Sequence, residues 1–265
     1  MSTARPRFDA YIGIDYSGAA TAERGLTGLR AYEATAGGPA TEIRPEPTGR
    51  RHWNRRALAA WLEARLLSRD RILVGIDHGF AFPKAWFDAH GVATDWDAFL
   101  ADFCHHWPTD HPDTTVESVR RGERGKGLAR LGDARWRRRT EQPVGAKSVF
   151  HFDVPGSVAK STHAGLPWIA RLRDRLGARL HAWPFDGWTI PADRSAIAEI
   201  YPSVWAAGYP RDQRTADQQD AYAVARALQE ADQASQLDAY LAPNLDAATA
   251  AAAVYEGWIL GVTGR

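Results

Sequence analysis

Two short apolar segments of this chain each end in an aspartate that a glycine follows within three residues. They are Tyr11–Asp15, with the sequence Y-I-G-I-D, and Ile72–Asp77, with the sequence I-L-V-G-I-D. Short apolar runs bounded by turn residues are typical of buried strands. Between them, Arg55–Leu67 has its leucines and a tryptophan at helical spacing. Because a strand, a helix and a second strand normally form a parallel pair, both aspartates are predicted to lie side by side at one edge of a sheet.

The other predicted strands and helices complete an α/β pattern. Turn signals at Gly37, Gly38 and Pro39 separate two segments that form an antiparallel meander after the first strand. A later alternating segment ends at Pro202, and two further segments have helical spacing. The strands are Leu26–Ala34, Thr41–Pro47 and Ala196–Tyr201, and the helices are about Ala216–Glu230 and Leu245–Leu260.

A chain of 265 residues fits one large α/β domain or two small ones. The stretch of about 84–190 is less regular and rich in Trp, His, Pro and Arg. We interpret it as a helical and loop insertion between the fourth and fifth strands. The prediction is therefore a single domain over residues 1–265 that contains this insertion.

Composition excludes several classes of protein. The net charge of +1 gives no overall attraction to nucleic acid or to membranes. The single cysteine, Cys104, excludes an intrachain disulfide framework, and with His105 and His106 it lacks the spaced pairs that are usual in zinc sites. No stretch approaches the about 18 apolar residues of a membrane span. We expect a cytoplasmic protein that does not enter the membrane.

Carboxylates converge on the predicted edge of the sheet. On the helix at about 216–230, Asp217 and Asp220 extend the apolar stripe, so they are expected to face the sheet. Clustered carboxylates repel one another unless a cation neutralises them, and carboxylate oxygens suit Mg²⁺ or Mn²⁺. Such ions can activate a water for phosphodiester hydrolysis. The candidates are Asp15, Asp77, Glu199 and Asp220, with Asp217 and Glu256 as further candidates.

Each carboxylate also has a structural interpretation. A strand-end aspartate often caps the turn that follows it. Glu199 would then pair with an arginine of the insertion, and Asp217 would be a first-turn residue that the helix dipole favours. Glu256 would accept a hydrogen bond from a backbone amide.

A local basic segment is hidden by the balanced net charge. Residues 120–147 hold ten basic and three acidic side chains, a local charge of +7. Trp136 lies among these arginines and Phe150 and Phe152 lie nearby, an arrangement typical of single-strand binding. A solvated surface with salt bridges is the alternative. The candidate substrate contacts are Arg135, Arg137, Arg138 and Arg139, together with Ser17 and His78 next to the two strand-end aspartates.

The order of these motifs resembles the family catalogued as domain of unknown function 429. The matching segments are Gly13–Gly18, Gly75–Pro83, Glu199–Pro202, Asp217–Ala223 and Glu256–Ile259. This family is described as predicted nucleases with an RNase H-like fold. The resemblance implies a mixed five-stranded sheet flanked by helices, with the first strand central beside the fourth. It also implies metal-ligand roles for Asp15, Asp77 and Asp220.

The leading hypothesis is a metal-dependent nuclease or phosphodiesterase that uses Mg²⁺ or Mn²⁺ and acts on nucleic acid or a nucleotide. In it Asp15, Asp77 and Asp220 hold the metal, and Glu199 is a ligand or orients the attacking water. One alternative is a nucleotide-binding phosphotransferase, although such proteins usually need two duplicated lobes. Another is a non-catalytic binding module whose carboxylates are paired by arginines of the insertion.

Overall fold

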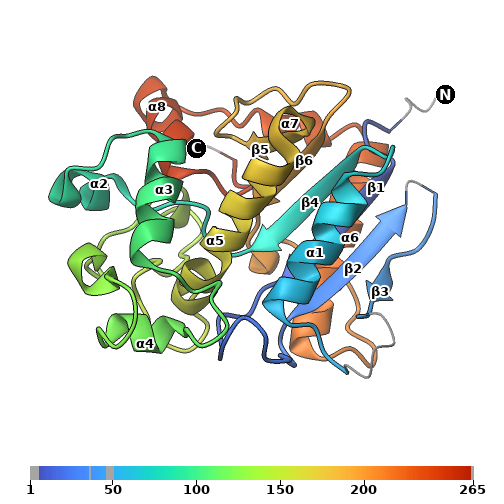
Figure 1. The fold of residues 1–265 in the computed structure, drawn as a ribbon. Coiled ribbons are helices and arrows are strands. Elements are labelled where there is room, and N and C mark those ends of the chain that lie inside the picture. Colours follow the sequence, from blue (N-terminus) through green and yellow to red (C-terminus); the bar gives the residue numbers. More distant parts are fainter. Residues whose placement is uncertain (1–5, 36, 46–50, 264–265) are drawn as a thin grey trace.

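A computed structural model describes residues 6–35, 37–45 and 51–263 of the chain. These residues contain one mixed sheet of six strands in the order β3-β2-β1-β4-β6-β5 (Figure 1). β2 is antiparallel to β1 and β3, whereas β1, β4, β6 and β5 are parallel to one another. The strands are β1 (Ala10–Asp15), β2 (Arg30–Thr35), β3 (Thr41–Ile43), β4 (Ile72–Asp77), β5 (Leu180–Trp183) and β6 (Ser195–Glu199).

The predicted α/β class is confirmed, but the predicted number of five strands is wrong. The additional strand, β5, has only four residues and pairs with β6 at the edge of the sheet. It lies inside the stretch interpreted as an insertion, where four residues are too few to show a clear alternation. The strand predicted over Thr41–Pro47 ends at Ile43, and its residues 46 and 47 lie outside the described part of the chain.

Helices cover both faces of the sheet. In Figure 1, α1 and α5 lie in front of the sheet and α6 lies behind it, while α2, α3 and α4 lie to one side. The long helices are α1 (Arg55–Leu66), α3 (Trp96–His106), α5 (Ala159–Leu176), α6 (Ala216–Gln233) and α8 (Ala247–Glu256). The short ones are α2 (Lys84–His90), α4 (Val116–Arg120) and α7 (Leu237–Leu241), with 3₁₀ turns at η1 (Gly127–Arg130), η2 (Arg139–Glu141), η3 (Gly177–Arg179), η4 (Pro202–Val204) and η5 (Ala206–Gly208).

Glycines in the two central strands allow α6 to approach the sheet closely. A Cβ atom on Gly13 would lie 2.2 Å from the carbonyl oxygen of Ala221, and one on Gly75 would lie 2.8 Å from a methyl carbon of Val224. Any larger residue at Gly13 would therefore push the helix backbone away from β1. This close contact brings the first turns of α6 to the carboxyl edge of the sheet.

The stretch of 84–190 contains more of the regular structure than predicted. Its helix α5 packs on the same face of the sheet as α1, and its strand β5 joins the sheet. An aromatic core with Phe82, Phe99 and Phe103 lies between this stretch and the sheet. Among the described residues, no helix is both long enough and apolar enough to cross a membrane.

Candidate functional site

The two strand-end aspartates lie opposite each other in the parallel pairing of β1 and β4. The register pairs Asp15 with Asp77 and, two residues earlier, Gly13 with Gly75. Because side chains alternate across a strand, all four positions face the side of the sheet that α6 covers. The prediction that the two aspartates lie side by side is confirmed.

The first two turns of α6 bring two more aspartates to this edge. The side chain of Thr215 caps the helix, and Asp217 and Asp220 follow it within six residues. The negative charge of each raises the pKa of Asp15, so both helix carboxylates lie near the strand ends. We call Asp15, Asp77, Asp217 and Asp220 the acidic cluster.

Burial and mutual repulsion raise the pKa values of three carboxyl groups of the acidic cluster. The pKa of Asp15 is raised from 3.8 to about 9, first by burial and then by the negative charges of the other three carboxylates of the cluster. The pKa of Asp77 is raised to about 8, first by burial and then by the negative charges of Asp220 and Glu199. The pKa of Asp220 is raised as well, chiefly by burial. At neutral pH both strand-end carboxyl groups therefore keep their protons unless a cation compensates their charge.

The side chains of the acidic cluster are of the type that binds a hard divalent cation. They do not converge on one point as the ligands of a bound ion do. Carboxylate oxygens are preferred ligands of Mg²⁺ and Mn²⁺, and Oδ1 of Asp77 is buried with no hydrogen-bond partner in the described residues. As placed, no three His, Cys, Asp or Glu side chains in that part of the chain converge closely enough to hold a metal ion, and this includes Cys104, His105 and His106. An ion would therefore require the carboxylates to turn toward a shared point.

Ser17 lies beside the acidic cluster, in the turn that follows β1. A Cβ atom on Gly28 would lie 3.6 Å from Oδ2 of Asp217 and 3.9 Å from Cβ of Ser17, so this loop and α6 meet there. The carbonyl oxygen of Ser17 accepts a hydrogen bond of 3.1 Å from Nη1 of Arg55. The structure thus places Ser17, a predicted substrate contact, and Asp217 around the same glycine, Gly28.

Glu199 is committed to a buried ion pair on the other face of the sheet. It lies opposite Ile76 in the register, one residue out of phase with Asp77. Its two oxygens accept hydrogen bonds of 2.5 and 2.6 Å from Arg138, and Oε2 also accepts one of 3.1 Å from the amide of Phe80. Arg138 pairs in addition with Glu141 at 2.8 Å. Glu199 therefore has the structural role considered above, pairing with an arginine, although its charge still raises the pKa of Asp77.

The four arginines predicted to contact substrate have different environments. Arg138 is only 1% exposed, so it is an internal ion-pair residue and not a surface contact as expected. Arg135 pairs with Asp133 at 2.5 Å, and Nη2 of Arg137 donates to two backbone carbonyl oxygens at 2.7 Å. Arg139 donates to the hydroxyl of a threonine on α8 at 3.1 Å. Internal pairing thus takes up much of the predicted basic surface.

His78 faces away from the acidic cluster although it follows Asp77 directly. With Tyr16 and Trp168 it lines a narrow cavity between the sheet and the helices α1 and α5. Its Nδ1 lies 2.9 Å from the carbonyl oxygen of Gly79, and burial lowers its pKa to about 4, so the ring is neutral. The alternation that directs Asp77 toward α6 directs His78 to the opposite face.

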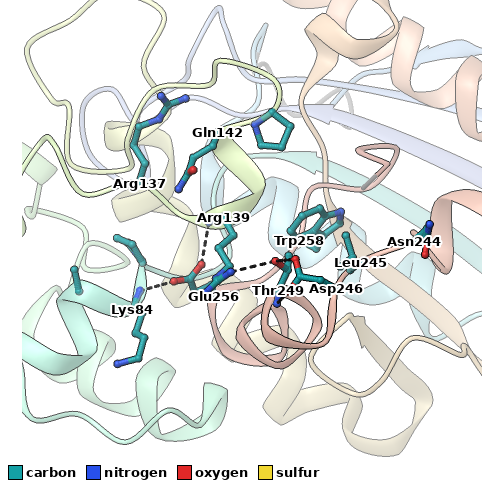
Figure 2. A pocket seen from close by; sticks show the side chains of 13 residues that line it. Lys84, Arg137, Arg139, Gln142, Asn244, Leu245, Asp246, Thr249, Glu256 and Trp258 are labelled. Atoms are coloured by element: carbon teal, nitrogen blue, oxygen red, sulfur yellow. Dashed lines mark hydrogen bonds between the residues drawn. The ribbon is translucent and has the colours of Figure 1, made fainter. Parts of the chain in front are cut away.

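Glu256 holds two backbone segments together beside a cavity that α8 helps to line. Its oxygens accept hydrogen bonds from the amides of Lys84 at 2.6 Å and Arg139 at 3.0 Å, as the structural interpretation expected. The cavity has a volume of about 500 Å³. Figure 2 shows Arg137 and Asn244 on different sides of the cavity. Glu256 lies between the two backbone segments whose amides it binds, those of Lys84 and Arg139. Glu256 thus belongs to this cavity's wall.

Arg30 is a residue of the site that the sequence analysis missed. It begins β2 and lies directly opposite Asp15 in the antiparallel register. Its positive charge lowers the pKa of Asp15, against the shift from burial. The signal was available in principle, because the first residue of a strand that returns beside β1 must lie near the residue that ends β1.

Comparison with known proteins adds no relative: no protein-family model, no curated protein and no solved structure matches this chain.

Proposed function

We propose that this chain is a divalent-metal-dependent hydrolase of phosphodiester bonds, a nuclease built on an RNase H-like arrangement. The observation that carries the proposal is the in-register pair Asp15 and Asp77 with Asp217 and Asp220 beside it. Three of these carboxylates have raised pKa values, and the charge of Asp217 adds to the repulsion, so the group is costly to maintain at one sheet edge without a counter-charge. Sites of perturbed carboxylates are candidates for function for that reason.

The order of the strands supports the RNase H-like part of the proposal. The resemblance implies a central first strand beside the fourth, and the turn signals at Gly37, Gly38 and Pro39 predict an antiparallel meander after the first strand. β1 lies between β2 and β4, β2 and β3 form that meander, and β6 follows on the far side of β4. The additional strand β5 is not one of these five strands, and it lies beside β6 at the edge of the sheet.

Within the proposal, Asp15, Asp77 and Asp220 are the residues that would hold Mg²⁺ or Mn²⁺. When bound, such an ion supplies activation of a water molecule and stabilisation of the leaving oxygen. Arg30 opposes the upward pKa shift of Asp15 and so favours its ionised form. Because Arg138 occupies both oxygens of Glu199, we assign the orientation of the attacking water to Asp217, which lies beside Ser17.

The non-catalytic binding module receives support only at Glu199. That hypothesis requires arginines of the insertion to pair with the carboxylates, as Arg138 does with Glu199. In the described residues, no ion pair joins an arginine or lysine to Asp15, Asp77 or Asp220. The acidic cluster therefore lacks the compensation that a purely structural role would need.

Calorimetric titration of Mn²⁺ tests the proposal most directly. Wild type would be compared with Asp15→Asn and Asp77→Asn, and with Asp174→Asn as a matched control at an exposed position on α5. The same four proteins would be assayed for cleavage of single-stranded DNA and RNA with Mn²⁺ and with EDTA.

We expect wild type and the control to bind Mn²⁺ and to cleave only when it is present, and both cluster variants to lose binding and cleavage. Absence of Mn²⁺ binding together with absence of Mn²⁺-dependent cleavage in wild type would refute the proposal. So would binding that both cluster variants retain unchanged.

A further inference from the structure

A second cavity, of about 270 Å³, adjoins the acidic cluster on the side of β2 and β3. Arg30 lines this cavity and is also the residue directly opposite Asp15 in the sheet. Thr215, the capping residue of α6, lines it as well, two positions before Asp217. The cavity thus lies at the start of α6, which also carries Asp217 and Asp220, and its Arg30 is the register partner of Asp15.

This cavity is basic, in contrast to the carboxylates beside it. Three arginines and one glutamate line it, a net charge of +2 with its histidine neutral. Arg30 and Arg44 share the single carboxylate of Glu42, at 3.0 and 3.1 Å. The exposed Arg51 has no ion pair or side-chain hydrogen bond in the part of the chain that the structure describes. Positive charge therefore exceeds its internal compensation.

Two buried polar atoms of the cavity's residues have no hydrogen-bond partner in the described part of the chain. Nε of Arg30 and Nδ1 of His52 are buried and without a hydrogen bond among the described residues. A buried polar group without a partner is destabilising, and such groups in native proteins call for an explanation. Arg30 Nε is a donor, so its missing partner is an acceptor. The start of α6, an 18-residue helix, adds the positive end of its dipole.

We propose that this cavity binds a phosphate group of the substrate. The proposal rests on the function proposed above and specifies it: the substrate presents a second phosphate beside the one that is attacked. A phosphate offers several acceptor oxygens and a negative charge to Arg30, Arg51 and His52. It also solves an electrostatic problem, because four carboxylates repel a polyanion and a neighbouring basic cavity attracts it.

Binding of inorganic phosphate and pyrophosphate to the metal-free protein in EDTA tests this inference. Isothermal titration of wild type would be compared with Arg51→Ala and with Arg69→Ala. Arg69 is also an exposed arginine. It lies just before β4, at the end of this strand opposite to Asp77. We expect Arg51→Ala to bind at least tenfold more weakly than wild type, and Arg69→Ala to bind like wild type.

Absence of phosphate and pyrophosphate binding in wild type would overturn the inference, as would equal binding by Arg51→Ala. Because no metal is present, this outcome is separate from the Mn²⁺ titration. If phosphate binds and Mn²⁺ neither binds nor supports cleavage, the anion site stands and the hydrolase proposal fails.

Oligonucleotides with and without a terminal phosphate identify the source of the bound group. If the phosphate is terminal, wild type should bind the phosphorylated strand more tightly and Arg51→Ala should lose that preference. If it is an internal phosphate, Arg51→Ala should weaken binding of both strands equally. Binding of both strands that Arg51→Ala leaves unchanged would contradict the inference.

Discussion

Replacing Asp15 by asparagine should stabilise the protein at neutral pH, and more so as the pH rises. The pKa of Asp15 is about 9 in the folded chain, against an ordinary value of 3.8. The folded state therefore binds a proton that the unfolded state releases above about pH 4. This proton's contribution to stability is complete below the pKa that Asp15 has in the unfolded chain. It is lost as the pH rises through the pKa that Asp15 has in the folded chain. Asparagine resembles the protonated carboxyl group in shape and does not titrate.

The magnitude follows from the same two pKa values. Each pH unit above 3.8 costs the folded state about 1.4 kcal/mol, so at pH 7 the upper limit is about 4 kcal/mol. Because four carboxylates share the repulsion and their protonation is coupled, we expect a measurable gain of about 1 to 3 kcal/mol. Asp15→Asn should then exceed wild type in free energy of unfolding by a margin that grows between pH 5 and pH 8, with a slope of up to about 1.4 kcal/mol per pH unit.

Urea denaturation of both proteins at several pH values, in EDTA, measures this margin. Asp174→Asn is the matched control and should show no comparable change of margin with pH. If Asp15→Asn is destabilised at pH 7, or if its margin over wild type is independent of pH, then Asp15 is not a buried, repelled carboxyl group and the reasoning fails.

Two further substitutions test the packing that positions the acidic cluster. Arg138→Met should lower the free energy of unfolding by about 3 to 5 kcal/mol, because it leaves Glu199 as an unpaired buried charge. Urea denaturation measures this loss. A loss below about 1 kcal/mol would show that this pair is not buried in solution. Gly13→Ala should cost about 1 to 3 kcal/mol, because the added carbon meets the backbone of α6. Gly37→Ala, where nothing lies within 4 Å, is its control, and equal melting temperatures for the two variants would contradict the close approach of α6.

Much of the central architecture could be predicted from local patterns. The two aspartate-ended strands, the helix between them and the helix α6 all have strong periodicity, and the structure places each within a few residues of its predicted bounds. The parallel pairing that puts Asp15 beside Asp77 was predicted from the strand–helix–strand connection. β5 was missed because four residues at a sheet edge, Leu180–Trp183, carry too little alternation to be recognised.

The partners of single side chains were harder to predict. Glu199 and Asp77 both lie at strand ends, yet their side chains leave opposite faces of the sheet because the register pairs Glu199 with Ile76. A shift of one residue in register reverses the face of every side chain. Sequence spacing does not specify that register between strands separated by the whole insertion.

The sequence by itself determined which carboxylates this protein brings to one edge of its sheet, because strand periodicity and the handed crossover act locally on the chain. Only the tertiary structure decided which of them stay uncompensated. Arg138 and Glu199 are 61 residues apart and meet through the packing of the insertion, whereas Arg30 reaches Asp15 through the return of β2. Such pairings depend on how distant segments pack, and electrostatic partners at that separation leave no periodic signal in the sequence.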